Sequence, residues 1–147
     1  MKFMVATAVT ALSFAGAAFA ESHAGSGDPA AGEKEFNKCK SCHMIVSDDG
    51  TEIVKGGRTG PNLWNVIGRQ AGMVEDFKGY GDSLVAAGEA GLVWDEENFV
   101  KYAEDPKKFL AEYLDDKGAR SKMSFKLRKG AEDVYAYLVS VSPEPES

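Results

Sequence analysis

The chain has 147 residues, a formal net charge of −6 and 44% hydrophobic residues, so its length fits a single domain. The acidic balance argues against a nucleic-acid-binding protein, because such proteins carry basic surfaces. Sixteen glycines predict many turns.

The first twenty residues have the pattern of a secretory signal peptide. Lys2 supplies the positive start, residues 3–19 are apolar and small, and Ala18-Phe19-Ala20 matches the A-x-A cleavage site. A membrane anchor is the weaker alternative, because serine, glycine and several alanines dilute the apolar run. We therefore expect residues 1–20 to be removed and the protein to be periplasmic and not membrane-embedded. The removed segment holds one lysine and no acid, which changes the net charge from −6 to −7.

The mature chain should begin with a flexible tail and then enter a helix. Residues 21–27 are small, polar and glycine-rich, and they include His23. Asp28 and Pro29 suit the N-cap and the first helical position, so a helix is predicted from there to about His43. The predicted folded domain covers residues 28–142, and residues 143–147 form a C-terminal tail.

The first helix carries a glycine that needs a reason. Gly32, Phe36 and Cys39 fall on one face. Glycine inside a helix costs roughly 1 kcal/mol relative to alanine. A second helix crossing at close range over Gly32 would explain this.

Cys39-Lys40-Ser41-Cys42-His43 has the C-x-x-C-H pattern of c-type haem attachment. Two cysteines on one helical face can bond one porphyrin, and the histidine can bind its iron. C-x-x-C also fits a redox dithiol, a disulfide or half a zinc site. There is no third cysteine, His23 is the only other histidine, and no βαβ pattern follows. The sequence therefore favours one covalently bound haem c.

The middle of the chain is rich in turn residues. A turn is predicted at residues 47–50 and a glycine-rich loop at residues 55–61. Such a loop could bind phosphate, but the G-x-x-x-x-G-K-[ST] pattern is absent, so a loop that covers the cofactor is favoured. Pro61 should start a short helix over residues 62–67 that stops at Gly68.

Further helices are predicted in the second half. Asp82 is predicted to cap a helix that ends near Ala87, and Asp95 to cap a helix that ends before Pro106. Residues 107–122 are predicted to form a loop or short helix. Near Gly130 a last helix begins, whose apolar stripe contains Val134, Tyr137, Leu138 and Val141. No long β-alternation is present, so the predicted fold is all-α, with several short helices around one haem.

Several residues could supply the second axial ligand of the iron. His23 would require the tail to fold back, and Met44 is too close to His43 to reach the opposite face. Met73 and Met123 both lie far enough along the chain, and each could also be a core methionine. The residues alone leave Met73 and Met123 open.

Charge is unevenly distributed along the chain. Residues 117–130 carry six basic side chains and no acid, whereas residues 89–105 are mainly acidic. We expect a strong dipole, with the basic segment available for docking to acidic partners.

Five motifs occur in order along residues 28–141: Cys39-x-x-Cys42-His43, Thr59-Gly60-Pro61-Asn62-Leu63, Gly68-Arg69 with Trp94, Asp105-Pro106-Lys107, and Lys122-Met123-Ser124-Phe125-Lys126. With them the chain resembles the class I c-type cytochromes, in particular the long bacterial forms of cytochrome c2 type. Trp64 departs from the family, where tyrosine or histidine is expected, and residues 110–122 are longer than in mitochondrial relatives.

The resemblance implies roles for individual residues. Met123 matches the axial methionine, opposite His43, and the Pro61 carbonyl matches the acceptor for the His43 ring N–H. Arg69, Tyr80 and Trp94 match residues near the haem propionates, and Tyr102 matches a phenol near the methionine sulfur. The first and last helices should cross.

The resemblance also implies a non-enzymatic, monomeric one-electron carrier. Its donor would be a membrane cytochrome bc complex and its acceptor a terminal oxidase or a photosynthetic reaction centre. Docking would use a set of lysines: Lys107, Lys108, Lys122, Lys126 and Lys129. The alternative is a haem enzyme or ligand-binding haem protein with an open iron position, which Met123 should prevent.

Overall fold

The computed structural model describes residues 25–142, in which five α-helices, one 3-10 turn and a two-stranded hairpin alternate with long loops. The predicted signal peptide, His23 and the predicted tail at 143–147 lie outside these residues. The elements are α1 Pro29–Glu35, η1 Phe36–Lys38, β1 Ile45–Val46, β2 Glu52–Val54, α2 Asp82–Glu89, α3 Glu96–Glu104, α4 Pro106–Tyr113 and α5 Ala131–Val141.

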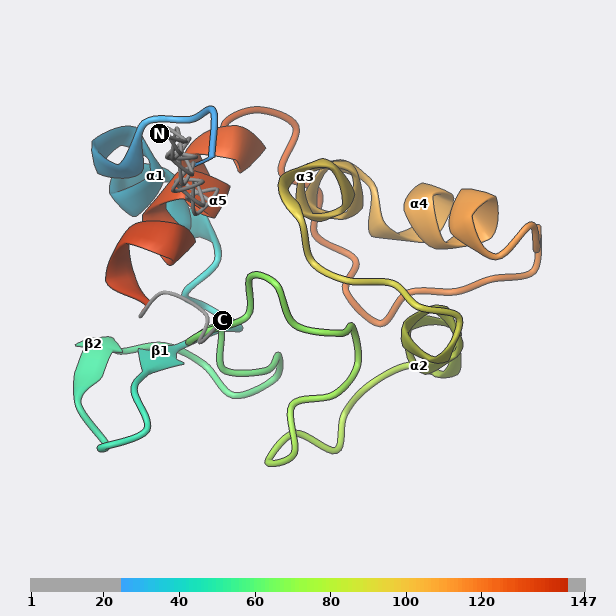
Figure 1. Ribbon diagram of the computed structural model, residues 1–147, viewed down its shortest axis with the longest axis horizontal. Helices are drawn as coiled ribbons and strands as arrows, with labels where there is room; N and C mark the ends of the chain where they lie inside the picture. Colours follow the sequence, from blue (N-terminus) through green and yellow to red (C-terminus); the bar gives the residue numbers. More distant parts are fainter. Residues whose placement is uncertain (1–24, 143–147) are drawn as a thin grey trace, which may run out of the picture.

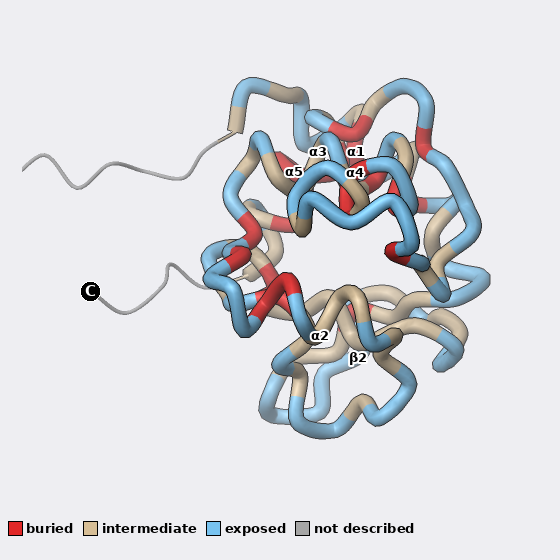
Figure 2. The backbone as a smooth tube through the Cα atoms, turned by 90° about the vertical axis from the view of Figure 1, so that its right-hand side faces the viewer, coloured by how far each residue is buried: buried red, intermediate tan, exposed pale blue. Residues whose placement is uncertain are grey.

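The helices form two sides of the molecule. In Figure 1, α1 and α5 cross at one end, α3 and α4 continue that side, and α2 and the hairpin lie across from them. Figure 2 shows the same division after a quarter turn. The predicted all-α fold, with crossing first and last helices, is confirmed.

The crossing of α1 and α5 depends on Gly32. A Cβ atom at Gly32 would lie 1.9 Å from the Asp133 carbonyl oxygen and 2.8 Å from Tyr137 Cβ. Beside it, the ring centroids of Phe36 and Tyr137 are 5.7 Å apart, and Phe36 is 1% exposed. The expectation of a close helix crossing at this glycine is confirmed.

The first helix begins as predicted and ends earlier. Asp28 accepts a hydrogen bond from Ala30 N at 2.9 Å, and Pro29 is the first helical residue. The α-helix stops at Glu35 and tightens into η1. After η1, the carbonyls of Lys40 and Cys42 accept 2.9 Å bonds from N–H groups of the glycine-rich loop, so they do not continue the helix.

Part of the predicted flexible tail is packed. Ser26 donates its main-chain N–H and its hydroxyl to Glu96 Oε1, at 2.7 and 2.5 Å. A Cβ at Gly27 would lie 2.3 Å from the Glu132 carbonyl oxygen, which shows contact with α5. Residues 25–27 therefore belong with the folded domain predicted to start at residue 28.

The hairpin was missed because its strands have two and three residues, too short for an alternating pattern. Its predicted turn is present: Gly50 N donates to Ser47 O at 2.9 Å, and Gly50 has a φ of +85°.

The predicted helix over residues 62–67 is wrong. Asn62 accepts hydrogen bonds from Val46 N and Trp64 N, at 3.0 and 3.1 Å, and its amide donates to Val46 O at 2.7 Å. Asn65 then adopts a φ of +54°. Asn62 thus joins this turn to β1, and the positive φ prevents a helix.

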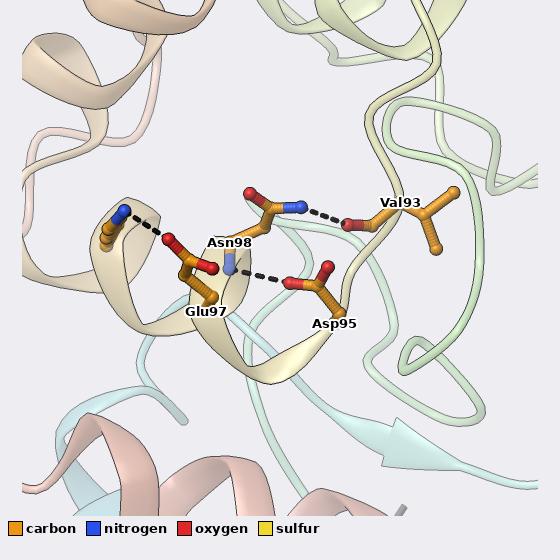
Figure 3. Close-up of polar contacts among 5 residues, drawn as sticks. Val93, Asp95, Glu97 and Asn98 are labelled. Atoms are coloured by element: carbon orange, nitrogen blue, oxygen red, sulfur yellow. Dashed lines mark hydrogen bonds and ion pairs between the residues drawn. The ribbon is translucent and has the colours of Figure 1, made fainter.

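The later helices follow the prediction closely. Helix α2 runs to Glu89, slightly beyond the predicted end, and its N-cap is Gly81 instead of the predicted Asp82, which is its first helical residue. Helix α4 provides the short helix expected within residues 107–122. Asp95 caps α3 by accepting from Asn98 N at 2.8 Å, while the Asn98 amide donates to Val93 O at 3.0 Å (Figure 3).

Replacing Gly32 with alanine tests which of two opposite effects is larger. Helix propensity favours alanine by about 1 kcal/mol, whereas overpacking a tight contact costs about 1–3 kcal/mol or more. The contact at 1.9 Å is with main chain, which cannot easily move, so Gly32→Ala should lower the free energy of unfolding by about 2 kcal/mol. Urea unfolding measures this, with Lys34→Ala on the exposed face of α1 as the control; a more stable G32A protein would contradict the crossing argument.

Candidate cofactor site

A cavity of about 450 Å³ lies at the centre of the fold. Among the described elements, η1, α2, α3 and α5 contribute to its wall, together with the loops between them. All of the site residues predicted from the sequence line this cavity: Cys39, Cys42, His43, Pro61, Arg69, Tyr80, Trp94, Tyr102 and Met123.

The two cysteines lie on adjacent turns and are not bonded to each other. Burial raises the pKa of the Cys39 thiol to about 11. The pKa of the exposed Cys42 is lowered by hydrogen bonds from the side chains of Thr59 and Ser41. Because the thiolate is the nucleophile, Cys42 is the more readily activated of the pair.

A hydrogen bond to Pro61 fixes the orientation of the His43 imidazole. Its Nδ1 lies 2.8 Å from the Pro61 carbonyl oxygen and can only donate to it, which leaves Nε2 as the unprotonated nitrogen. Burial lowers the pKa of His43, so the neutral ring predominates at neutral pH. A neutral imidazole held by its other nitrogen is the form that binds a metal.

The glycine-rich loop lies directly against the C-x-x-C-H backbone. A Cβ at Gly56 would be 1.8 Å from the His43 carbonyl oxygen, and one at Gly57 would be 2.1 Å from that of Ser41. A Cβ at Gly60 would lie 2.3 Å from Cε1 of the His43 ring. The loop predicted to cover the cofactor therefore packs against the segment that would attach it.

The structure separates the three candidate methionines. Met123 lines the cavity together with His43, and Met44 and Met73 are not among its lining residues. Met73 is 53% exposed. Of the three, Met123 alone therefore lines the same cavity as the histidine of the C-x-x-C-H motif.

Polar side chains in the cavity wall are hydrogen-bond donors. Burial raises the pKa of Tyr80 and of Tyr102, so both phenols stay protonated at neutral pH. The Tyr80 oxygen accepts from Val74 N at 3.3 Å and keeps its own proton to donate. Tyr102 stacks at a tilt on Trp94, with ring centroids 4.9 Å apart. With the guanidinium of Arg69, these groups suit a carboxylate-bearing ligand.

Sequence reasoning assigned no role to several wall residues. Ser121 lies 3.5 Å from the Tyr102 hydroxyl, and Phe125 lines the cavity while remaining 42% exposed. Ser121 lies two residues before Met123 and Phe125 two residues after it. Once Met123 is chosen as the ligand, this spacing could have suggested that both residues line the same cavity. The rest of the wall is largely apolar and includes Leu63, Val66, Leu84 and Phe99.

The lysines predicted to dock partners differ in their surroundings. Lys108 lies 3.8 Å from Glu112, and Lys126 lies 2.6 Å from Asp105. Within residues 25–142, Lys107, Lys122 and Lys129 have no carboxylate within ion-pair distance. The acidic and basic segments therefore touch at Asp105 and Lys126 instead of lying wholly at opposite poles.

The residues of the cavity fit a haem. The volume is in the usual range for bound cofactors, and the wall is mostly apolar with a few donors. Two thiols, a neutral imidazole and a thioether are the groups that attach and ligate a c-type haem. The fold and the cavity thus define a site for a covalently bound haem.

Comparisons with known proteins agree with this site. Cytochrome c-551 of Roseobacter denitrificans is 66% identical over 135 residues, which covers 91% of this chain and 92% of that protein. Cytochrome c2 of Rhodobacter capsulatus is 56% identical over 138 residues, 94% of this chain and 96% of that protein. The solved cytochrome c2 structure from Rhodobacter sphaeroides matches with a TM-score of 0.78 and 53% identity, over 81% of this chain and 99% of that chain. No family model matches the chain.

The chain therefore belongs to the class I c-type cytochromes, in the bacterial cytochrome c2 group. It is an electron carrier with one covalent haem c, as the resemblance of its sequence implied. Within the described part of the chain, no helix has the length and apolarity needed to cross a membrane.

Substituting Gly60 with alanine should disturb haem binding. The added Cβ would lie 2.3 Å from the His43 ring, so the imidazole must turn away from Pro61. We expect the exported G60A protein to contain less haem per polypeptide, measured by absorbance against total protein. Lys55→Ala, at an exposed position of the same loop, is the control; equal haem content in both variants would contradict this role of Gly60.

Proposed function

We propose that the protein is a soluble, monomeric, periplasmic one-electron carrier whose haem is bound through Cys39 and Cys42 and ligated by His43 and Met123. The observation that carries this proposal is that His43 and Met123 line the same cavity, with the imidazole oriented by the Pro61 carbonyl at 2.8 Å. The haem supplies reversible one-electron chemistry at its iron.

The ligand set explains why such a site would carry electrons. A histidine and a methionine together raise the reduction potential of haem iron. Pro61 keeps the His43 ring in one tautomer and orientation, which limits rearrangement between oxidation states. The largely apolar wall excludes water and keeps the surrounding dipoles fixed.

Two protein ligands also argue against an enzyme. With His43 and Met123 both engaged, neither axial position is available to oxygen or substrate. The alternative, a haem enzyme or a ligand-binding haem protein, needs an open position. Carbon monoxide distinguishes them, because the ferrous carrier should not bind it and an open site should.

The cavity donors support placement of the haem propionates. Arg69, Tyr80 and Trp94 all line the cavity, and the Tyr80 hydroxyl retains its proton for a carboxylate acceptor. Tyr102 is proposed to face the Met123 thioether, since its hydroxyl is 3.5 Å from Ser121, two residues before Met123. Each of these groups would then hold the cofactor without reacting.

The proposed partners are a membrane cytochrome bc complex as donor and a terminal oxidase or photosynthetic reaction centre as acceptor. The most similar proteins include cytochromes c2, and the N-terminal segment has the signal-peptide pattern expected for export. Docking would use basic side chains of α4 and of residues 122–129, which surround Met123: Lys107, Lys108, Lys122, Lys126 and Lys129. Lys122 is exposed at the cavity wall. Electron-transfer contacts of this kind are small, brief and weakened by salt.

Absorption spectra of haem-loaded variants test the axial methionine. The ferric wild-type protein should show the weak near-infrared band of a sulfur–iron bond, and Met123→Ala should lose it and gain carbon monoxide binding when reduced. Met73→Ala removes an exposed methionine outside the cavity and should keep the band. A band lost in M73A and kept in M123A would overturn the assignment.

Stopped-flow reduction by a purified cytochrome bc complex tests the docking surface. Lys122→Glu replaces an attraction by a repulsion at the cavity wall, so the rate at low ionic strength should fall by roughly tenfold, and less at high salt. Lys34→Glu, the same charge change on α1, should have little effect. Equal rates for K122E and the wild type at low salt would refute docking at this face.

A further inference from the structure

The segment around Met123 is held to the rest of the protein mainly at its two ends. At one end, Arg120 N donates to Ser83 Oγ at 3.0 Å, and Ser121 contacts the Tyr102 hydroxyl. At the other end, Leu127 N donates to Ala103 O at 2.8 Å, and Leu127 is 3% exposed. Between them, residues 122–126 make no main-chain hydrogen bond to other main-chain groups of residues 25–142. Side-chain contacts must therefore hold this stretch.

Asp105 makes such a contact from the junction of α3 and α4. Its Oδ1 accepts from Lys108 N at 3.2 Å and caps α4, while its Oδ2 accepts from Lys126 Nζ at 2.6 Å. Ala103 lies in the last turn of α3, and its carbonyl accepts from Leu127 N at 2.8 Å. One helix junction thus binds the end of the Met123 segment through two successive residues, Lys126 and Leu127.

We propose that Asp105 is a positioning residue for Met123, holding the methionine segment against the haem through its ion pair with Lys126. This rests on the proposed axial role of Met123. Lys126 is three residues from the ligand, and the pair is the single ion pair that ties residues 117–130 to the rest of the described chain. Part of the positive charge of Lys126 is then used inside the protein, so Lys126 contributes less to docking than Lys122.

An exposed ion pair can matter here because the segment that it holds has few other bonds. The side chains of Lys126 and Asp105 are 41% and 32% exposed, and pairs of this kind contribute only weakly to stability because water screens the charges. Such an energy is small for the whole fold. It is a large share of what holds a stretch without main-chain hydrogen bonds, so its loss should favour local opening over global unfolding.

The test uses the haem-loaded ferric protein in urea at fixed pH and ionic strength. Asp105→Asn removes the charge and keeps an N-cap, because asparagine caps helices as well as aspartate. The near-infrared sulfur–iron band reports Met123, and circular dichroism reports the helices. In D105N the equilibrium constant for loss of the band should rise about fivefold, while the circular dichroism midpoint stays at the wild-type value.

Matched variants separate this role from a general loss of stability. Lys126→Gln should behave like D105N, and the double variant should be no worse than either single one. Glu97→Gln breaks an exposed pair within α3, Glu97–Lys101 at 2.5 Å, and should leave the band unchanged. A D105N response equal to that of E97Q, or equal shifts of band and helices, would overturn the positioning role. Absence of the band in the wild-type protein would instead overturn the axial role of Met123, and the positioning role with it.

Discussion

The close contact between the glycine-rich loop and the C-x-x-C-H backbone is the constraint on which the site depends. Gly56, Gly57 and Gly60 approach that backbone and the His43 ring at distances where no Cβ fits. This approach brings the Pro61 carbonyl to 2.8 Å from Nδ1 of His43. Because Nδ1 is engaged with Pro61, Nε2 is the nitrogen that would bind iron in the proposed site.

The centre of the fold is a cavity where other small proteins have their core. The tightest helix contact, α1 on α5, lies beside it and is made possible by Gly32. Much of the cavity wall is formed by loops, among them residues 122–126, which make no main-chain hydrogen bond to other main-chain groups of residues 25–142. A bound haem would therefore complete the packing of this domain, and the Met123 side would be the part that opens most easily.

Charge serves two purposes in the same segment. Lys122 is exposed at the cavity wall without an acidic partner in the described chain, which suits a brief electrostatic encounter. Lys126, four residues later, is bound by Asp105 at 2.6 Å. A count of basic residues treats the two alike, whereas in the structure Lys126 is in an ion pair and Lys122 has no carboxylate partner among residues 25–142.

The sequence by itself determined the chemistry and most of the helices. The C-x-x-C-H motif predicts the haem, the caps at Asp28 and Asp95 predict where helices begin, and Gly32 predicts the crossing. These features are local, so spacing and residue type are sufficient to predict them. Tertiary structure decided what depends on distant partners. It ended α1 early and replaced the predicted helix after Pro61 with turns bound to β1, because main-chain groups there bond to residues remote in sequence. It also placed Met123, and not Met73, in the cavity wall. The residues alone had left these two methionines open, because their spacing from His43 does not show which of them reaches the cavity; only the family resemblance favoured Met123.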